Sequence, residues 1–460
     1  MSAVRRLVPG DGEHGGPVTP GRRRRTAPAP GDSSAGARRP TGRLRRLYLL
    51  LGPGFVTGAS DDDPSGIGTY SVAGASFGFA TLWMAWVTFP LMAAVQLICA
   101  KMGMVTGMGL AGVLRCHTPR GVLYPMIGGL VVANTLNAGV DIGAIAAAIN
   151  LLAPGLPILW LVAPIAMMIL ALQIFGAYRL IASVLKLLAL SLLAYVASSF
   201  FAKPDWWEVA RGTFVPTVSL DATYLAMLVA ILGTTISPYL FFWQTDHEVE
   251  EEIAHGRTQL AERRGATDAE IKLARIDVGI GMFFSNAVMY FIILATAATL
   301  FKAGTTDINS ATDAAEALRP LAGDAASLLL AVGLVGTGLL AVPILTASAA
   351  YAVCQAAGWS CGLSKRWREA RRFYGIIVVC TLVGMMVNFA GINPIDALFW
   401  TAVVNGFIAP PMLVVIMRLA NDRSVMGDRV NGVWLNLLGW TTTVLMFGAA
   451  IALVLTWGKG

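Results

Sequence analysis

The sequence predicts an all-α integral membrane protein of about eleven transmembrane helices, in which helices 1 and 6 are broken near the membrane midplane. The 460 residues are 56% hydrophobic and only 13% charged, whereas an ordinary soluble domain carries about 25% charged residues. Runs of about 20 apolar residues, the length that spans a bilayer, follow one another after residue 46. Two of these runs contain helix-breaking motifs near their centres.

Each of the eleven apolar segments is long enough to cross the membrane as a helix. Outer-membrane barrel strands are segments of about ten residues with alternating polarity, so the sequence excludes a barrel. The predicted spans lie near 50–77, 79–104, 122–152, 156–175, 179–201, 222–246, 276–301, 324–358, 372–391, 395–420 and 432–457.

The Lys and Arg residues of short loops predict the orientation, because they concentrate on the cytoplasmic side. An N-terminus in the cytoplasm leaves outside only Lys203, Arg211, Lys302, Arg319 and Lys459. Every other loop arginine then lies inside, for example Arg115, Arg264 and Arg371. We therefore expect a multi-pass plasma-membrane protein with its C-terminus outside.

Residues 1–46 are rich in Arg, Pro, Gly and Ser and lack the apolar residues needed for a core. We expect a disordered basic cytoplasmic tail that is attracted to anionic lipids. The run from Arg22 to Arg25 would also fit nucleic-acid binding or an export signal, but no cleavable apolar segment follows it. We therefore expect residues 47–460 to form a transmembrane domain that lies in the lipid bilayer. We expect no nucleic-acid partner.

The cysteines and histidines indicate neither a resident cofactor nor an enzyme. The five cysteines form no CxxC pair and no Cys/His cluster with metal-site spacing. No nucleophile and base stand near each other in the sequence, although such groups converge only in three dimensions.

The first break is the motif Asp61-Asp62-Asp63-Pro64-Ser65-Gly66. Proline removes a backbone donor and glycine relaxes the backbone, so the helix should unwind here and expose carbonyl oxygens beside the carboxylates. The alternative is a loop between two short interfacial helices, but residues 50–60 and 67–77 are each too short to span. Ionisable residues at this depth are costly and indicate function.

The second break is Gly233-Thr234-Thr235-Ile236-Ser237-Pro238-Tyr239 in the sixth span. A proline kink without a site is the alternative. Interrupted helices at corresponding places in two halves are, however, typical of inverted-repeat transporters with a midplane site. Spans one and six stand five apart, which predicts one repeat over about 48–201, a second over about 222–420, and an extra helix at about 432–457.

The atoms at the breaks favour a hard cation. Asp63, with Asp62, offers anionic oxygen, and Ser237, Thr234 and Thr235 offer neutral oxygen. Neither break contains Cys, Met or His. All-oxygen sites favour Mg²⁺, Ca²⁺ or Mn²⁺, and the carboxylates would repel an anion.

The first span resembles the opening helix of the Nramp divalent-metal transporters. In that family Asp-Pro-Gly-Asn is followed, ten residues after the Asp, by Ala-Gly-Ala and then Phe-Gly or Tyr-Gly. Here Asp63-Pro64, Ala73-Gly74-Ala75 and Phe77-Gly78 match without a gap. Ser237-Pro238-Tyr239 occupies the place of the family's Met-Pro-His. The resemblance covers residues 48–457 and implies a leucine-transporter-type 5+5 inverted repeat with the metal between helices 1 and 6.

The resemblance also implies the ligands. Asp63 keeps the place of the family's Asp, whereas Gly66 replaces the Asn and Ser237 replaces the Met. The two backbone carbonyls would come from Ser60 and Thr234. Loss of the thioether removes a soft ligand, and the smaller residues should leave room for an ion that keeps its waters, so we favour the family's magnesium-transporting branch.

Proton coupling is expected to be weak or absent. In the family a proton route resembles a chain from the helix-1 Asp through an Asp and a Glu on helix 3 to the His of helix 6. The Glu place matches Asp141, but the Asp place is Ala138 and the His place is Tyr239, and tyrosine titrates near pH 10. Asp141 would equally fit a hydrogen-bonded polar residue between helices. We predict that four further residues line the ion pathway without binding the metal directly: Asp62, Asp141, Tyr239 and Asn405.

The segment after the sixth span contains Asp246, His247 and Glu248 followed by Glu250 to Glu252. We expect a solvated cytoplasmic loop here, with a cation-attracting vestibule as the alternative.

The predicted function is transport of a divalent cation, Mg²⁺ or Mn²⁺, by alternating access, without making or breaking a bond. Alternatives are a proton-coupled Mn²⁺/Fe²⁺ importer of the ordinary Nramp type and an organic-cation or amino-acid symporter with an apolar pocket. A membrane enzyme or receptor is disfavoured because the outer loops are short and poor in reactive groups. The sequence leaves the oligomeric state open.

Overall fold

The computed structural model describes residues 57–58, 60–175, 194–306, 308, 311–316, 323 and 326–456. All of them belong to one compact unit, Leu47–Gly460. The predicted basic tail 1–46, the start of the first span and most of the fifth span lie outside the described residues.

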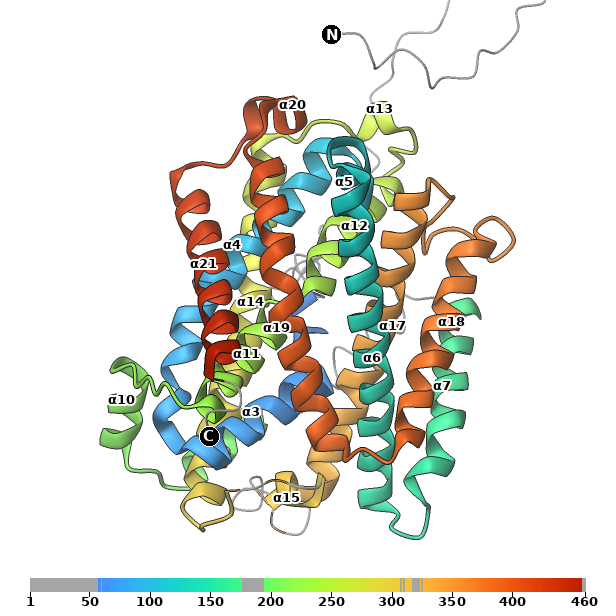
Figure 1. The fold of residues 1–460 in the computed structure, drawn as a ribbon. Helices are drawn as coiled ribbons and strands as arrows, with labels where there is room; N and C mark the ends of the chain where they lie inside the picture. Colours follow the sequence, from blue (N-terminus) through green and yellow to red (C-terminus); the bar gives the residue numbers. More distant parts are fainter. Residues whose placement is uncertain are drawn as a thin grey trace, which may run out of the picture. The chain divides into compact units, whose positions relative to one another are not determined.

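The described chain is helical throughout (Figure 1). Within it, nine helices are long and apolar enough to cross a membrane. All nine correspond to predicted spans and agree with them within a few residues at most ends, because long apolar runs identify spanning helices well. The nine are α4 (Trp83–Thr106), α6 (Arg120–Leu152), α7 (Ile158–Phe175), the pair α11 (Ala222–Thr235) and α12 (Pro238–Ala254), α14 with η3 (Asp268–Thr296 and Ala297–Phe301), α17 (Ala326–Ala357), α18 with η5 (Arg371–Val387 and Asn388–Ala390), α19 (Pro394–Ala420) and α21 (Val433–Thr456).

Both predicted breaks are present. Asp61 is helical, Asp62 and Asp63 are not, and α3 (Pro64–Phe77) begins at the proline. In the sixth span α11 ends at Thr235 and α12 begins at Pro238. Proline at the first position of a helix lacks only an amide that would have no intrahelical partner, so each proline starts a new helix rather than bending an old one.

The acidic segment after the sixth span is not a solvated loop, contrary to expectation. It continues α12 to Ala254, and Asp246 and Glu248 are only 2% and 7% exposed. The Asp246 carboxylate accepts a hydrogen bond from Gln355 on α17, and Glu250 accepts one from the Tyr351 hydroxyl on the same helix. Charged residues that would be solvated in isolation are thus buried by partners distant in sequence.

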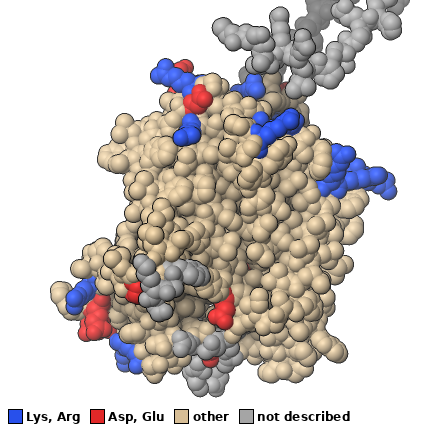
Figure 2. All heavy atoms as spheres, viewed as in Figure 1, with Lys and Arg blue, Asp and Glu red and all other residues tan. Residues whose placement is uncertain are grey.

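The helices around the breaks form the centre of the described unit. α3 contacts α6, α11, α14 and α19, while α6 also packs against α17 and α18. The connecting helices α5 (Leu110–His117), α13 (Leu260–Arg263) and α20 (Arg423–Met426) lie at one end of the bundle, and α10 (Trp206–Phe214) and α15 (Ala311–Glu316) lie at the other (Figure 1). On the face shown in Figure 2, Lys and Arg gather mainly at the α13 and α20 end, and the middle carries few charged side chains. This distribution is typical of a bundle that crosses a membrane.

Candidate metal site at the two helix breaks

Asp63 forms the N-cap of α3. Its backbone is extended, with φ −68° and ψ 168°, and one carboxylate oxygen accepts the Gly66 amide at 2.7 Å. Aspartate is favoured at this position because its oxygen satisfies an amide that has no partner within the helix. The short-range motif that breaks the helix therefore also fixes the carboxylate.

The second carboxylate oxygen of Asp63 faces α6. It accepts a hydrogen bond of 2.9 Å from the Asn137 side-chain amide nitrogen. Asp63 is 2% exposed and Asn137 is 1% exposed. Neighbouring groups on two helices thus hold one buried carboxylate in a single orientation.

Asp61 and Asp62 turn toward α14 instead. The Ser285 hydroxyl donates to Asp61 at 2.6 Å and lies 3.3 Å from an Asp62 oxygen. Both aspartates are fully buried. The three consecutive carboxylates are therefore divided between two neighbouring helices, and the structure brings Asp62 to Ser285 rather than to the partners of Asp63.

Ser237 caps the broken end of α11. Its hydroxyl donates to the Thr234 carbonyl at 2.6 Å and lies 2.8 Å from the Gly233 carbonyl. The Ser60 carbonyl, in turn, accepts the Tyr239 hydroxyl at 2.9 Å. Both backbone carbonyls predicted as ligands are thus already hydrogen-bonded. A carbonyl oxygen has two lone pairs, so each retains one with which it could bind a cation.

Gly66 lies where the two breaks meet. A Cβ at this position would be 3.3 Å from the Asp61 carbonyl, the Thr234 hydroxyl and the Tyr70 ring. The expectation that Gly66 leaves room for a hydrated ion is therefore not met in this conformation, because Tyr70 and Thr234 fill that space. Tyr70 also approaches the Thr235 hydroxyl at 3.5 Å.

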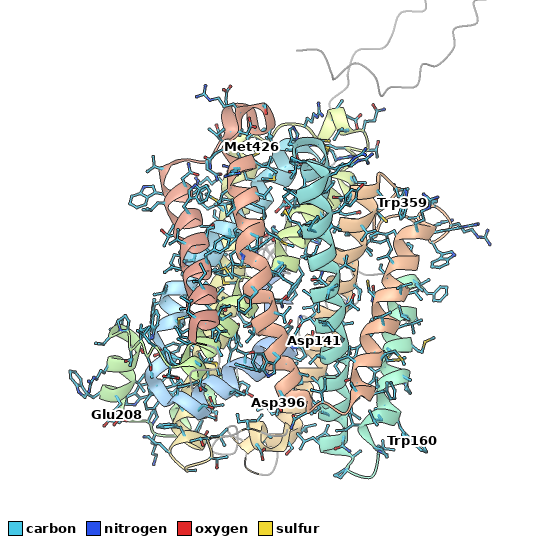
Figure 3. All side chains as sticks on the ribbon, viewed as in Figure 1. Asp141, Trp160, Glu208, Trp359, Asp396 and Met426 are labelled. Carbon is cyan, nitrogen blue, oxygen red and sulfur yellow. The ribbon has the colours of Figure 1, made fainter. Side chains whose placement is uncertain are left out.

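Asp141 lies on α6 in the interior of the bundle, away from both ends (Figure 3). It is fully buried, and neither carboxylate oxygen has a hydrogen-bond partner of good geometry within the described residues. Asn137, four residues earlier on the same helix, donates a hydrogen bond to Asp63. Asp141 thus lies on the helix that holds Asp63, and both interpretations of this residue stay predictions.

Asn405 and Tyr239 are also buried, at 2% and 1% exposure. Asn405 lies on α19 between Ala402 and Gly406, the stretch that packs against Gly233 at the end of α11. Both residues thus stand close to the second break, and their part in the pathway stays a prediction.

A cavity of about 160 Å³ adjoins the first break. Its wall includes Pro64 and Gly68 of α3, Ala144 of α6, Leu334 of α17 and Leu398 of α19. Most of the lining is apolar, and Ala314 of α15 places the cavity toward that end of the bundle. Space of this size holds several water molecules.

Sequence reasoning missed three neighbours of the breaks. Asn137 and Ser285 hold the aspartates, and the Met289 sulfur on α14 lies 3.8 Å from the Thr235 hydroxyl. Asn137 shared a helix face with Asp141 at the i, i+4 spacing, which was a usable signal. The other two gave none, because their roles depend on the packing of α14.

No group of three or more His, Cys, Asp or Glu side chains in the described ranges is arranged to hold a metal ion. A cation beside Asp63 would therefore need backbone, hydroxyl or amide oxygens to complete its coordination. The described residues around Asp63 supply these oxygens from α6, from the end of α11 and from the segment before α3.

Comparison with known proteins extends over nearly the whole chain. Residues 54–456 match the model of the family described as natural resistance-associated macrophage protein-like, Nramp. The chain is 28% identical over 422 residues to the divalent metal cation transporter MntH of Bacillus subtilis (strain 168), covering 89% of this chain and 93% of that protein.

Solved structures confirm the fold. The Eremococcus coleocola manganese transporter, in complex with an aromatic bis-isothiourea substituted compound, superimposes with a TM-score of 0.70 at 20% identity, covering 91% of this chain and 88% of that one. Mhp1, a nucleobase-cation-symport-1 family transporter, matches with a TM-score of 0.55 at 12% identity, covering 89% and 93%. The predicted leucine-transporter-type arrangement with broken helices 1 and 6 is thus confirmed, and the chain belongs to the Nramp family.

Proposed function

We propose that this chain moves divalent metal cations across the plasma membrane by alternating access, and that it favours hard ions, Mg²⁺ and also Mn²⁺. The observation that carries the proposal is the Asp63 carboxylate, which is buried at the break where α3 begins. A buried carboxylate at a helix break is costly unless a cation or proton compensates it. The relatives named as divalent metal and manganese transporters support the same class of substrate.

The hard-ion preference rests on the atoms beside Asp63. Its neighbours offer amide, hydroxyl and carbonyl oxygens, and Ser237 stands where the resemblance places a thioether. Hard oxygen ligands suit Mg²⁺ and Mn²⁺. The preference does not rest on free space at Gly66, because its neighbours already occupy that space.

An ordinary Mn²⁺ importer is the second candidate, because one soft atom lies near the second break. The Met289 sulfur contacts the Thr235 hydroxyl rather than a group bound to Asp63. A rearrangement that brought this sulfur to the ion would favour Mn²⁺ or Fe²⁺ over Mg²⁺.

Uptake into proteoliposomes tests the proposal directly. With full-length protein we expect saturable uptake of Mg²⁺ and Mn²⁺, and we expect Asp63→Asn to abolish both, because it removes the main charge that binds the ion. Asp428→Asn, which changes an exposed carboxylate far from the breaks, should transport as the wild type does. Uptake of Fe²⁺ or Cd²⁺ without any Mg²⁺ flux would overturn the hard-ion preference.

We further propose weak or absent proton coupling. The Tyr239 hydroxyl donates to the Ser60 carbonyl, and Ala138 offers no titratable group on α6. Tyrosine titrates near pH 10 and is a poor carrier at neutral pH. A pH indicator sealed inside the vesicles should therefore show no acidification during inward metal uptake. Acidification at a fixed ratio to metal flux would contradict the proposal.

A further inference from the structure

We propose that Asp141 and Asn137 of α6 are ligands that complete the cation site with Asp63, so that the ion binds between the start of α3 and α6. This inference rests on the proposed function and makes its site more specific. The resemblance places the ion between the two broken helices, whereas the unused oxygens of this chain lie toward α6.

Asp141 supplies the second carboxylate. It is fully buried, it lies within a membrane-spanning helix, and both of its oxygens lack a hydrogen-bond partner of good geometry among the described residues. A charged group left without a partner at this depth is costly, and such groups mark ion sites.

Asn137 supplies a neutral oxygen. Its side-chain nitrogen donates to Asp63 at 2.9 Å, while its side-chain oxygen is buried and has no partner within the described residues. An amide oxygen is a hard ligand of the kind that Mg²⁺, Mn²⁺ and Ca²⁺ accept. The same amide therefore orients Asp63 and leaves an oxygen next to it.

The spacing on α6 brings these groups together. Asn137 and Asp141 stand four residues apart, so they share one face of the helix. Asn137 touches Asp63 directly, so this face of α6 is turned toward the Asp63 carboxylate. Two carboxylates that repel each other in a buried site are both stabilised by a cation between them.

The cavity provides access on this side. Its wall includes Pro64, the residue after Asp63, and Ala144, less than one turn beyond Asp141. On the other side, the Ser60 and Thr234 carbonyls each already accept one hydrogen bond, whereas the Asn137 and Asp141 side-chain oxygens have no partner within the described residues. Two carboxylates and one amide oxygen, with water from the cavity, form the kind of partly hydrated site that Mg²⁺ usually occupies.

Calorimetric titration of the full-length protein with Mn²⁺ tests this site. We expect Asp141→Asn and Asn137→Ala each to raise the Kd by at least about tenfold, since even indirect partners of a metal ligand change affinity by about 10–100-fold. Asn134→Ala is the matched control. Asn134 is equally buried on α6, one turn away from Asn137, and its amide donates to the Leu345 carbonyl of α17 instead. This control should bind Mn²⁺ as the wild type does.

A ligand exchange distinguishes coordination from a structural or long-range electrostatic role. A thiolate is a soft ligand, so Asp141→Cys should bind Cd²⁺ at least about tenfold more tightly relative to Mn²⁺ than the wild type does, whereas Asn134→Cys should not. If Asp63→Asn loses Mn²⁺ binding while the Asp141 and Asn137 variants keep the wild-type Kd and Cd²⁺ preference, this inference is overturned and the proposed function stands. If the wild type binds no divalent cation, both are overturned.

Discussion

At the scale of single residues, local chemistry made Asp63 predictable and tertiary packing concealed its partners. The Asp-Pro-Ser-Gly motif breaks the helix, caps α3 and fixes one carboxylate oxygen, all through contacts within three residues. The hydrogen bond from Asn137 joins residues 74 positions apart, and that from Ser285 to Asp61 joins residues 224 apart. No sequence pattern shows that residues so far apart will be in contact. The aspartates at the break could therefore be predicted, whereas their partners Asn137 and Ser285 could not.

Substitutions of Ser237 test whether a sulfur ligand at the second break changes the ion preference. Ser237→Met should increase Cd²⁺ uptake relative to Mg²⁺ uptake in proteoliposomes, because it places a soft thioether at the end of α11. It also removes the hydroxyl that caps the Thr234 carbonyl, which should lower the free energy of unfolding by about 1 kcal/mol. Ser237→Ala removes the same hydroxyl without adding sulfur and should leave the uptake ratio unchanged. An equal change of the ratio in both variants would show that the hydroxyl, not the sulfur, is responsible.

At the scale of elements, the sequence predicted the positions of the spanning helices more accurately than their ends. α12 and α14 each extend beyond the apolar run predicted as a span. In α12 the added turns include Glu248, which is buried within the bundle, whereas the added turns of α14 are mostly exposed. α14 also begins with a capping box in which Thr267 and Glu270 bond reciprocally. Hydropathy alone cannot recognise a charged turn that other helices cover, so the acidic segment was wrongly predicted as a loop.

The contact between α11 and α19 depends on Gly233. A Cβ there would lie 2.1 Å from the Ala402 carbonyl and 2.4 Å from the Gly406 amide, which real contacts do not allow. Gly233→Ala should therefore separate the helices and lower the free energy of unfolding by about 1–3 kcal/mol.

Gly279 on α14 is the matched control for this substitution. A Cβ there meets nothing within 4 Å, so Gly279→Ala should raise stability by about 0.5–1 kcal/mol through the lower backbone entropy of alanine. Thermal unfolding in detergent, followed by the loss of the monodisperse peak, measures both variants. Equal shifts in the two midpoints would contradict a specific contact at Gly233.

At the scale of the whole molecule, apolar length predicted the nine spanning helices that the described residues contain, and loop charge predicted an orientation. The spans follow from apolar length, a property that neighbours do not alter. The orientation, with the α5 and α13 end in the cytoplasm, agrees with the clustering of Lys and Arg at that end of the face in Figure 2. It remains a prediction that cysteine chemistry can test.

Cys116 and Cys361 lie in segments predicted to be cytoplasmic but should react very differently. Cys116 is exposed near the end of α5, so a membrane-impermeant maleimide should label it in inside-out vesicles and not in intact cells.

Burial, with the nearby Asp246 charge, raises the pKa of the Cys361 thiol to about 12. Only the thiolate reacts, so Cys361 should label slowly near neutral pH, and its rate should rise about tenfold per pH unit below 12. A Cys116→Ser variant isolates this slow phase. Labelling of Cys116 in intact cells would reverse the proposed orientation, and fast labelling of Cys361 at pH 7 would show that its loop opens.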